Sequence, residues 1–255
     1  GVKRNDEVLT QSLNFVASTN AINQCNAFPV FIDVSKESLG MSPQSLEGFL
    51  KENCEIRDDG LCWNKTSDRI IKACMPMHTF GLPLDLDKIN KICVKYNLRL
   101  IEDAAESLGS FYKKKHTGTI GDFGVLSFNG NKIITCGGGG MVLTNDPEKA
   151  ALAKHITTTA KLNREWFFDH DRIGFNYRMP NLNAALGVSQ IKKLPNFLSA
   201  KRSIAEDYLD YAKSYNLRFQ KEPQNTRSNY WLNTLILDDI NQRNDILKQT
   251  NQSKV

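Results

Sequence analysis

Lys132 has the surroundings that amine chemistry requires. It lies in the stretch SFNGNKIITCGGGG, between Asn131 and the apolar pair Ile133-Ile134. Partial removal of an ammonium group from water favours the neutral amine, which is the form that attacks carbonyl groups to give Schiff bases. A surface lysine after a strand would show the same local pattern, so this stretch alone leaves both interpretations open.

Asp103 indicates a partner for such a lysine. It follows the apolar run LRLIE, and a carboxylate beside a buried strand is costly unless it is paired. A protonated pyridine nitrogen would be such a partner, and the pairing makes a pyridine cofactor a better electron sink. A helix cap or an ordinary ion pair would also explain Asp103 alone. Together, Asp103 and Lys132 narrow the chemistry to a pyridoxal phosphate (PLP) site.

The segments that must position these residues alternate between strands and helices. Short apolar runs predict strands at 29–34, 70–78, 98–104, 124–128 and 140–144. Amphipathic spacing and caps predict helices at 85–96, 147–160, 181–192 and 195–214, and one that begins at Pro43 behind the cap Ser42. Residues 54–68 and 161–180 show little pattern and predict loops. This alternation favours a parallel or mixed sheet covered on both faces.

Ligands bind to such sheets at the carboxyl ends of the strands. This rule adds His78, Glu106 and Ser127 to the candidate residues, because each lies at or just after the carboxyl end of a predicted strand. The run Gly137 to Gly140 lacks the GK[ST] ending of a nucleotide P-loop. We interpret it as a flexible approach to the next strand, with contact to the cofactor lysine as the alternative.

The composition is that of an ordinary folded chain. Of its 255 residues, 40% are hydrophobic and 24% charged, and no run approaches the roughly 20 apolar residues that cross a membrane. A net charge of +5 without a dense basic face weighs against a nucleic-acid partner. The 6 cysteines form no CxxC pair and no zinc-type spacing with histidine. We therefore expect no metal and a cytoplasmic location.

The run from His78 to Lys132 resembles the DegT/DnrJ/EryC1/StrS aminotransferases, PLP enzymes that act on nucleotide-linked keto-sugars. The resemblance continues through 137–146 and 173–190, and back through 14–34. It implies the α/β fold-type I PLP aminotransferase fold, a mixed, mostly parallel sheet flanked by helices with a smaller C-terminal α/β domain. SFNGNKIITCGGGGM and HITTTAK are similar to the branch that adds the 4-amino group of legionaminic acid, bacillosamine or perosamine, with the legionaminic type nearest.

The resemblance implies a role for each matching position. Lys132 would form the Schiff base with PLP and move the proton between the substrate α-carbon and the cofactor C4′. Asp103 would pair with the pyridine nitrogen, and Phe15 would stack on the ring. Ser127 would hydrogen-bond the phosphate. Some relatives with histidine in place of this lysine are dehydratases, and Lys132 argues against that activity here.

Two further positions bear on protonation and assembly. Glu106 stands where many members have glutamine, near the ring hydroxyl of the cofactor, so its protonation state becomes a question. Asn176 would reach the phosphate bound by the neighbouring subunit, which implies a homodimer with shared active sites. His78 would lie near the pocket without an assigned role, and a hydrogen-bonded histidine at a strand end is an equal alternative. Lys113–Lys115 would form a hairpin, solvated or in contact with a diphosphate.

The resemblance also implies two domains. Residues 1–194 would form a large PLP-binding domain, and 195–255 a linking helix and the start of a small domain that includes strands at 217–219 and 230–238. The family's phosphate-holding Gly-(Thr/Ser)-Ala turn would precede Gly1, and the last residues show no closing element. We therefore expect a fragment that lacks both ends.

The implied activity is amino transfer to a nucleotide-linked keto-sugar. The expected donor is glutamate, and the expected acceptor is C4 of a 4-keto-6-deoxy sugar used for lipopolysaccharide or capsule. Two alternatives stay open: a catalytically silent homologue that binds a sugar nucleotide or a protein partner, and an aminotransferase for a 3-keto sugar or a cyclitol. Retention of Lys132, Asp103 and Ser127 weighs against the silent homologue.

Overall fold

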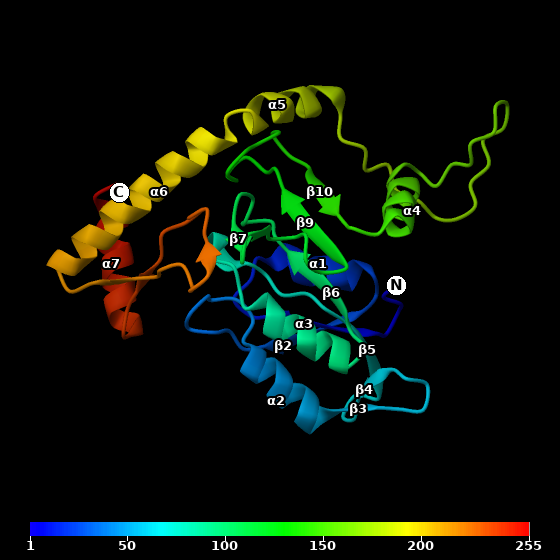
Figure 1. Ribbon diagram of the computed structural model, residues 1–255, viewed down its shortest axis with the longest axis horizontal. Coiled ribbons are helices and arrows are strands. Elements are labelled where there is room, and N and C mark those ends of the chain that lie inside the picture. The colour runs from blue at the N-terminus through cyan, green and yellow to red at the C-terminus, as the bar shows by residue number, and fades with distance from the viewer. Residues whose placement is uncertain (255) are drawn as a thin grey trace.

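An 8-stranded mixed sheet forms the centre of the structure, a computed structural model that describes residues 1–254 (Figure 1). Its main path is β10-β9-β6-β5-β1-β2, with β4 paired to β5 and β3 to β4. The strands are β1 Glu7–Gln11, β2 Phe28–Ile32, β3 Cys54–Ile56, β4 Cys62–Asn64, β5 Arg69–Cys74, β6 Arg99–Asp103, β9 Phe123–Ser127 and β10 Gly140–Leu143. Neighbours from β2 to β9 pair parallel, whereas β3, β4 and β10 pair antiparallel. The predicted mixed, mostly parallel sheet is confirmed.

Helices connect these strands and extend beyond them. They are α1 Val16–Gln24, α2 Pro43–Asn53, α3 Leu86–Lys95, α4 Pro147–Thr157, α5 Asn181–Ile191, α6 Leu194–Ser214 and α7 Ile240–Gln252, with a 3-10 turn at Thr79–Gly81. The predicted caps are confirmed, because Ser42 accepts the backbone N–H of Ser45 and Asp146 accepts those of Glu148 and Lys149. Proline stands at the start of both helices, where its missing N–H costs nothing.

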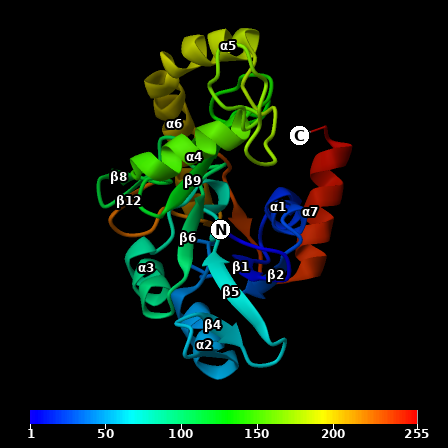
Figure 2. The ribbon, with the colours of Figure 1, turned by 90° about the vertical axis from the view of Figure 1, so that its right-hand side faces the viewer.

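The two faces of the sheet bury different side chains. Leu9 and Cys74 pack in the cluster that includes α2 and α3, whereas their neighbours Val8 and Ala73 pack with Ile22 of α1. This follows from the strand geometry, which points successive side chains to opposite faces. Figure 2 shows α2 and α3 on one side of the sheet and α1 on the other. Helices thus cover both faces and leave the strand ends for the site.

The prediction of a loop over 54–68 is wrong, because this segment contains the hairpin β3–β4. Each strand has only three residues, and polar exposed side chains hide the alternation in the sequence. Side-chain contacts across the turn support the hairpin: the Arg57 guanidinium lies 4.4 Å from the centre of the Trp63 ring, whose Nε1–H donates to Asp59.

The end of the chain also differs from the prediction. Only Leu235–Ile236 (β13) of the predicted strand 230–238 is a strand, and it pairs with β11, Arg218–Phe219. Tyr230 and Trp231, at the start of the predicted strand, are buried instead, whereas Leu232 is exposed. Residues 240–252 form α7, capped by Asp239, where the sequence indicated no closing element. The predicted hairpin around Lys113–Lys115 is present.

A small sheet joins that hairpin to a late segment. Its strands are β7 Phe111–Tyr112, β8 Lys115–His116 and β12 Thr226–Arg227, in the order β12-β7-β8. Residues after 195 therefore pair directly with residues of the first predicted domain. The division into 1–194 and 195–255 stays a prediction.

The cysteines are all free thiols, and Cys74 and Cys93 are buried core residues as predicted. Residues 1–254 contain no group of three or more His, Cys, Asp or Glu side chains that could hold a metal ion. Within the same residues, no helix has both the length and the apolar character to span a membrane.

Truncation of one core side chain tests this packing. Ile89 of α3 is fully buried, so Ile89→Ala should lower the free energy of unfolding by about 2–5 kcal/mol through lost burial and a new cavity. Val94 lies on the same helix and is exposed, so Val94→Ala should change it by less than about 0.5 kcal/mol. Urea unfolding of both variants measures the difference, and equal losses would contradict the packing described.

Candidate active site

Strands β6 and β9 bring the predicted residues to one edge of the sheet. Asp103, the last residue of β6, pairs in register with Val125, and the next N–H, of Ala104, donates to the Val125 carbonyl at 3.0 Å. Ser127 ends β9 on the same edge. The loop that follows turns back at once, since the Lys132 N–H donates to the Asn129 carbonyl at 3.1 Å. Asp103, Ser127 and Lys132 therefore come from neighbouring parallel strand ends.

Lys132 is largely removed from water, which favours the shielded amine over the surface lysine that the sequence left as an alternative. Its side chain is 14% exposed. Its Nζ lies 3.8 Å from Oε1 of Glu106 and 4.1 Å from the centre of the Trp231 ring. The amine is thus held between a carboxyl group and an aromatic face.

Asp103 is anchored from two sides. Its Oδ2 accepts the Ser18 hydroxyl at 2.6 Å, and its Oδ1 accepts the Ala105 N–H at 3.1 Å. Each carboxylate oxygen has two acceptor positions, so these bonds leave capacity for a further donor. The side chain is only half-buried, which keeps that capacity accessible.

Phe15 and Ser127 flank these groups. Phe15 caps α1, and its carbonyl accepts the N–H of Ser18, the residue that bonds Asp103. Phe15 is 68% exposed, so it presents an accessible aromatic side chain one helical turn before Ser18. The hydroxyl of Ser127 is half-buried and accepts the Asn129 N–H at 3.4 Å.

Glu106 has a perturbed ionisation. Burial raises its pKa above the ordinary value and Asp103 adds to the rise, whereas the Phe80 N–H and Lys132 oppose it without cancelling it. The Phe80 N–H donates to Oε2 at 2.8 Å from a backbone with φ of 56°. That left-handed conformation is strained for phenylalanine, and here it aims a donor at the site. A raised pKa favours the protonated acid, which offers one donor and one acceptor side as glutamine does.

His78 is a core residue and not part of this site. Its ring is fully buried, and its Nδ1 accepts the Leu84 N–H, which assigns the proton to Nε2. Nε2 lies 3.1 Å from Oε2 of Glu102. The hydrogen-bonded alternative for His78 is therefore the one that the structure supports.

Asn176 is not brought to the other predicted residues. It lies on the long extension between α4 and α5, which projects at the right of Figure 1, and it forms a β-bridge with Thr158. Its side chain is exposed. Among residues 1–254 it has no hydrogen bond to Lys132, Asp103 or Ser127, and its predicted role in a neighbouring subunit stays a prediction.

Sequence reasoning missed several residues that shape the site. Ser18 and Phe80 hold Asp103 and Glu106, and Trp231 covers Lys132. Trp231 lies in an apolar run that predicted a strand, so the pattern did not distinguish a strand residue from one that covers Lys132. The available signal for Ser18 was its place one helical turn after the predicted site residue Phe15.

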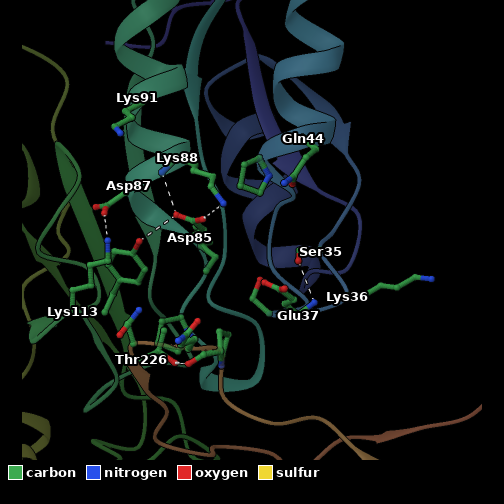
Figure 3. A pocket seen from close by; sticks show the side chains of 18 residues that line it. Ser35, Lys36, Glu37, Gln44, Asp85, Asp87, Lys88, Lys91, Lys113 and Thr226 are labelled. Atoms are coloured by element: carbon green, nitrogen blue, oxygen red, sulfur yellow. Dashed lines mark hydrogen bonds and ion pairs between the residues drawn. The ribbon is translucent and has the colours of Figure 1, made fainter.

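A separate cavity of about 680 Å³ lies beside the N-termini of α2 and α3 (Figure 3). None of the predicted site residues lines it. Two of the lysines that line it are paired with carboxylates: Lys88 lies 2.8 Å from Asp85, and Lys113 pairs with Asp87. We therefore place the candidate active site at the edge that carries Lys132.

The residues at that edge fit PLP. Asp103 offers acceptor capacity for a protonated ring nitrogen, Phe15 offers an aromatic face, and Lys132 offers an amine shielded from water. Ser127 adds a hydroxyl at the next strand end. PLP needs this set of groups: a carboxylate, a stacking surface, a lysine and phosphate donors.

The buried Glu102 yields a test of the scaffold below the site. Burial alone would raise its pKa, but His78 and the N–H groups of Gly121 and Gly118 outweigh it and hold the pKa below the ordinary value near 4.5. A lowered native pKa gives stability that is present above the unfolded-state pKa and is lost as the pH falls through the native value.

Glu102→Gln should therefore cost about 3–5 kcal/mol at neutral pH and flatten the acid side of the stability curve. Urea unfolding at a series of pH values measures both effects. Glu52→Gln, at an exposed position of α2, is the matched control and should leave the curve unchanged. A Glu102→Gln curve that keeps the full acid-side slope would refute this assignment.

Comparison with known proteins agrees with this geometry. The DegT/DnrJ/EryC1/StrS aminotransferase family matches residues 1–255. The GDP-perosamine synthases of Vibrio cholerae and Escherichia coli O157:H7 are each 36% identical to the chain, over 241 and 247 residues, which is 93% and 96% of it. The chain spans only 60% and 62% of the length of these relatives.

Solved structures show the same fold. A DegT DnrJ EryC1 StrS aminotransferase from Brucella abortus superposes with a TM-score of 0.87 at 26% identity, over 100% of this chain and 64% of the other. The aminotransferase TlmJ from Streptoalloteichus hindustanus gives 0.86 at 30% identity, over 99% and 65%. From its sheet, its strand-end lysine and aspartate and these matches, the chain belongs to the DegT/DnrJ/EryC1/StrS family of PLP-dependent aminotransferases.

Proposed function

We propose that this protein moves an amino group from glutamate to C4 of a nucleotide-linked 4-keto-6-deoxy sugar, with PLP as cofactor. The observation that carries the proposal is the shielded amine of Lys132, in contact with Glu106 at the edge where Asp103 ends its strand. Family membership supplies the reaction class, and the geometry supports Lys132 as the residue that reacts.

The side chains divide the work of amino transfer. When bound, PLP supplies a carbonyl group for the amine and a ring that withdraws electrons. Asp103 would hold a positive charge on the ring nitrogen, because Ser18 and Ala105 fix its carboxylate. Lys132 would carry the proton between substrate and cofactor, and its burial limits the access of water to its amine. Burial raises the pKa of Glu106, whose carboxyl lies 3.8 Å from the Lys132 amine.

The substrate assignment rests on the relatives and on the C4 branch that the sequence resembles. Two of the similar proteins are named GDP-perosamine synthase, and perosamine is one of the products of this branch. We propose C4 amination for lipopolysaccharide or capsule, with a legionaminic-type product as the first candidate. Amine analysis of the product from each nucleotide keto-sugar distinguishes legionaminic acid, bacillosamine and perosamine precursors, and a 3-amino sugar or aminocyclitol would replace the C4 assignment.

We also propose a cytoplasmic homodimer. The extension between α4 and α5 exposes large apolar side chains: Trp166 and Phe168 are each 79% exposed, and Ile173 is 87% exposed. A patch of this kind marks an interaction surface. A second copy that covers it would also bring its own Asn176 to the first site, as the resemblance implies. The free thiols of the chain suit a reducing compartment.

The reaction class is tested by the visible spectrum of the full-length protein with PLP. Wild type should show the absorption band of the lysine-bound cofactor, and glutamate should bleach it. Lys132→Ala should lack the band and lose at least about 100-fold in rate, because it removes both nucleophile and proton carrier. Lys91→Ala, an exposed lysine of α3, is the matched control and should behave as wild type.

Each outcome has a defined meaning. A wild-type band that glutamate does not bleach would refute glutamate as the donor. Binding of a sugar nucleotide without any band would favour the catalytically silent homologue instead.

The shared site is tested by mixing two inactive variants. Chains with Lys132→Ala and with Asn176→Ala, refolded together, form mixed dimers in which one site has both residues intact. Activity should return to about a quarter of wild type, because half of the dimers are mixed and each has one working site. Each variant refolded alone is the control. No recovery on mixing would show that Asn176 does not serve the neighbouring subunit.

A further inference from the structure

We propose that Trp231 is a positioning residue for Lys132, which holds the reactive amine in place for PLP. The proposal rests on the proposed function and adds a residue to its site. Trp231 lies in the segment Ser228–Trp231, called the strap below, which follows β12 and is far from Lys132 in sequence.

Trp231 contacts the lysine at two points. The centre of its ring lies 4.1 Å from Nζ of Lys132, and its Nε1–H donates to the carbonyl of Asn131 at 2.8 Å. The indole is 8% exposed. One rigid side chain therefore holds both the amine and the backbone immediately before it. A ring face attracts an ammonium group, and a buried N–H needs its acceptor.

The strap is itself fixed on the loop that carries Glu106. The side-chain amide of Asn229 donates to the carbonyls of Glu106 and Leu108, each at 2.9 Å. The Asn229 Oδ1 then accepts the N–H of Trp231 at 2.9 Å. Asn229 thus hydrogen-bonds to the loop after β6, and Trp231 hydrogen-bonds to the loop after β9. The strap sets the distance between the two loops whose side chains meet at Lys132.

Close packing leaves the strap little freedom. A Cβ on Gly81 would meet Oδ1 of Asn229 at 1.8 Å, so only glycine fits there. The Gly81 carbonyl accepts the hydroxyl of Ser228 at 3.0 Å. Arg202 of α6 donates to the Ser228 carbonyl at 3.0 Å and pairs with Glu222 through two bonds. Trp231 therefore approaches Lys132 from a fixed direction.

The test measures which lysines of the protein react with PLP. Full-length protein freed of cofactor is mixed with PLP, the adducts are trapped with borohydride, and mass spectrometry of peptides gives the share of label on Lys132 against surface lysines. In wild type the label should concentrate on Lys132. Trp231→Leu should lower that selectivity by about tenfold, because the ring contact and the hydrogen bond are both lost. Trp231→Phe keeps a ring face and should restore part of it.

A second tryptophan provides the matched control. Trp63 also contacts a cation through its ring and donates its Nε1–H, yet it lies on the β3–β4 hairpin away from the site. Trp63→Leu should label Lys132 as selectively as wild type does. Urea unfolding of every variant shows whether it is folded. If Trp231→Leu does not fold, Trp231→Phe decides, since it loses only the bond to Asn131.

The outcomes separate this proposal from the proposed function. Wild type without selective label at Lys132 would overturn the proposed function. Selective label in wild type together with equal or greater label in a folded Trp231→Leu would overturn the positioning role alone. If the Leu variant is unfolded, wild-type selectivity in the Phe variant would overturn the role of the hydrogen bond to Asn131.

Discussion

The contact between the Lys132 amine and the Glu106 carboxyl joins the loop after β6 to the loop after β9, which are separate in the sequence. It exists because β6 and β9 are neighbouring parallel strands, whose carboxyl ends share one edge of the sheet. Their side chains would still be free to diverge beyond that edge. Phe80 fixes the carboxyl through a strained backbone N–H, and Trp231 fixes the amine through its ring. The sheet thus brings the two loops together, and contacts from Phe80 and Trp231 orient the side chains.

The sequence was sufficient for the parts of the site that depend on strand ends. Asp103, Ser127 and Lys132 each follow an apolar run, and the rule for parallel sheets then places them together. Trp231 could not be found this way, because an apolar run near the end of the chain predicts a strand equally well. Its burial depends on loops distant in sequence. The β3–β4 hairpin was missed for a local reason, since three-residue strands are too short to show alternation.

The strap changes how the two predicted domains relate to the chemistry. Residues after 195 are not simply a neighbouring lobe, because Asn229 and Trp231 contact both loops of the site. Arg202 anchors the strap on α6. Hydrogen bonds therefore connect α6, through the strap, to the backbone beside Lys132.

Two glutamates near the carboxyl end of β6 show how the fold sets charge at the site. Glu102 and Glu106 are both buried, yet their pKa values shift in opposite directions. Glu102 accepts the N–H groups of Gly118, Ile120 and Gly121 and faces His78, so its carboxylate is stabilised. Glu106 accepts one backbone N–H and lies near Asp103, so burial prevails. His78 and the additional backbone donors therefore lower the pKa of Glu102 despite its burial, whereas burial raises that of Glu106.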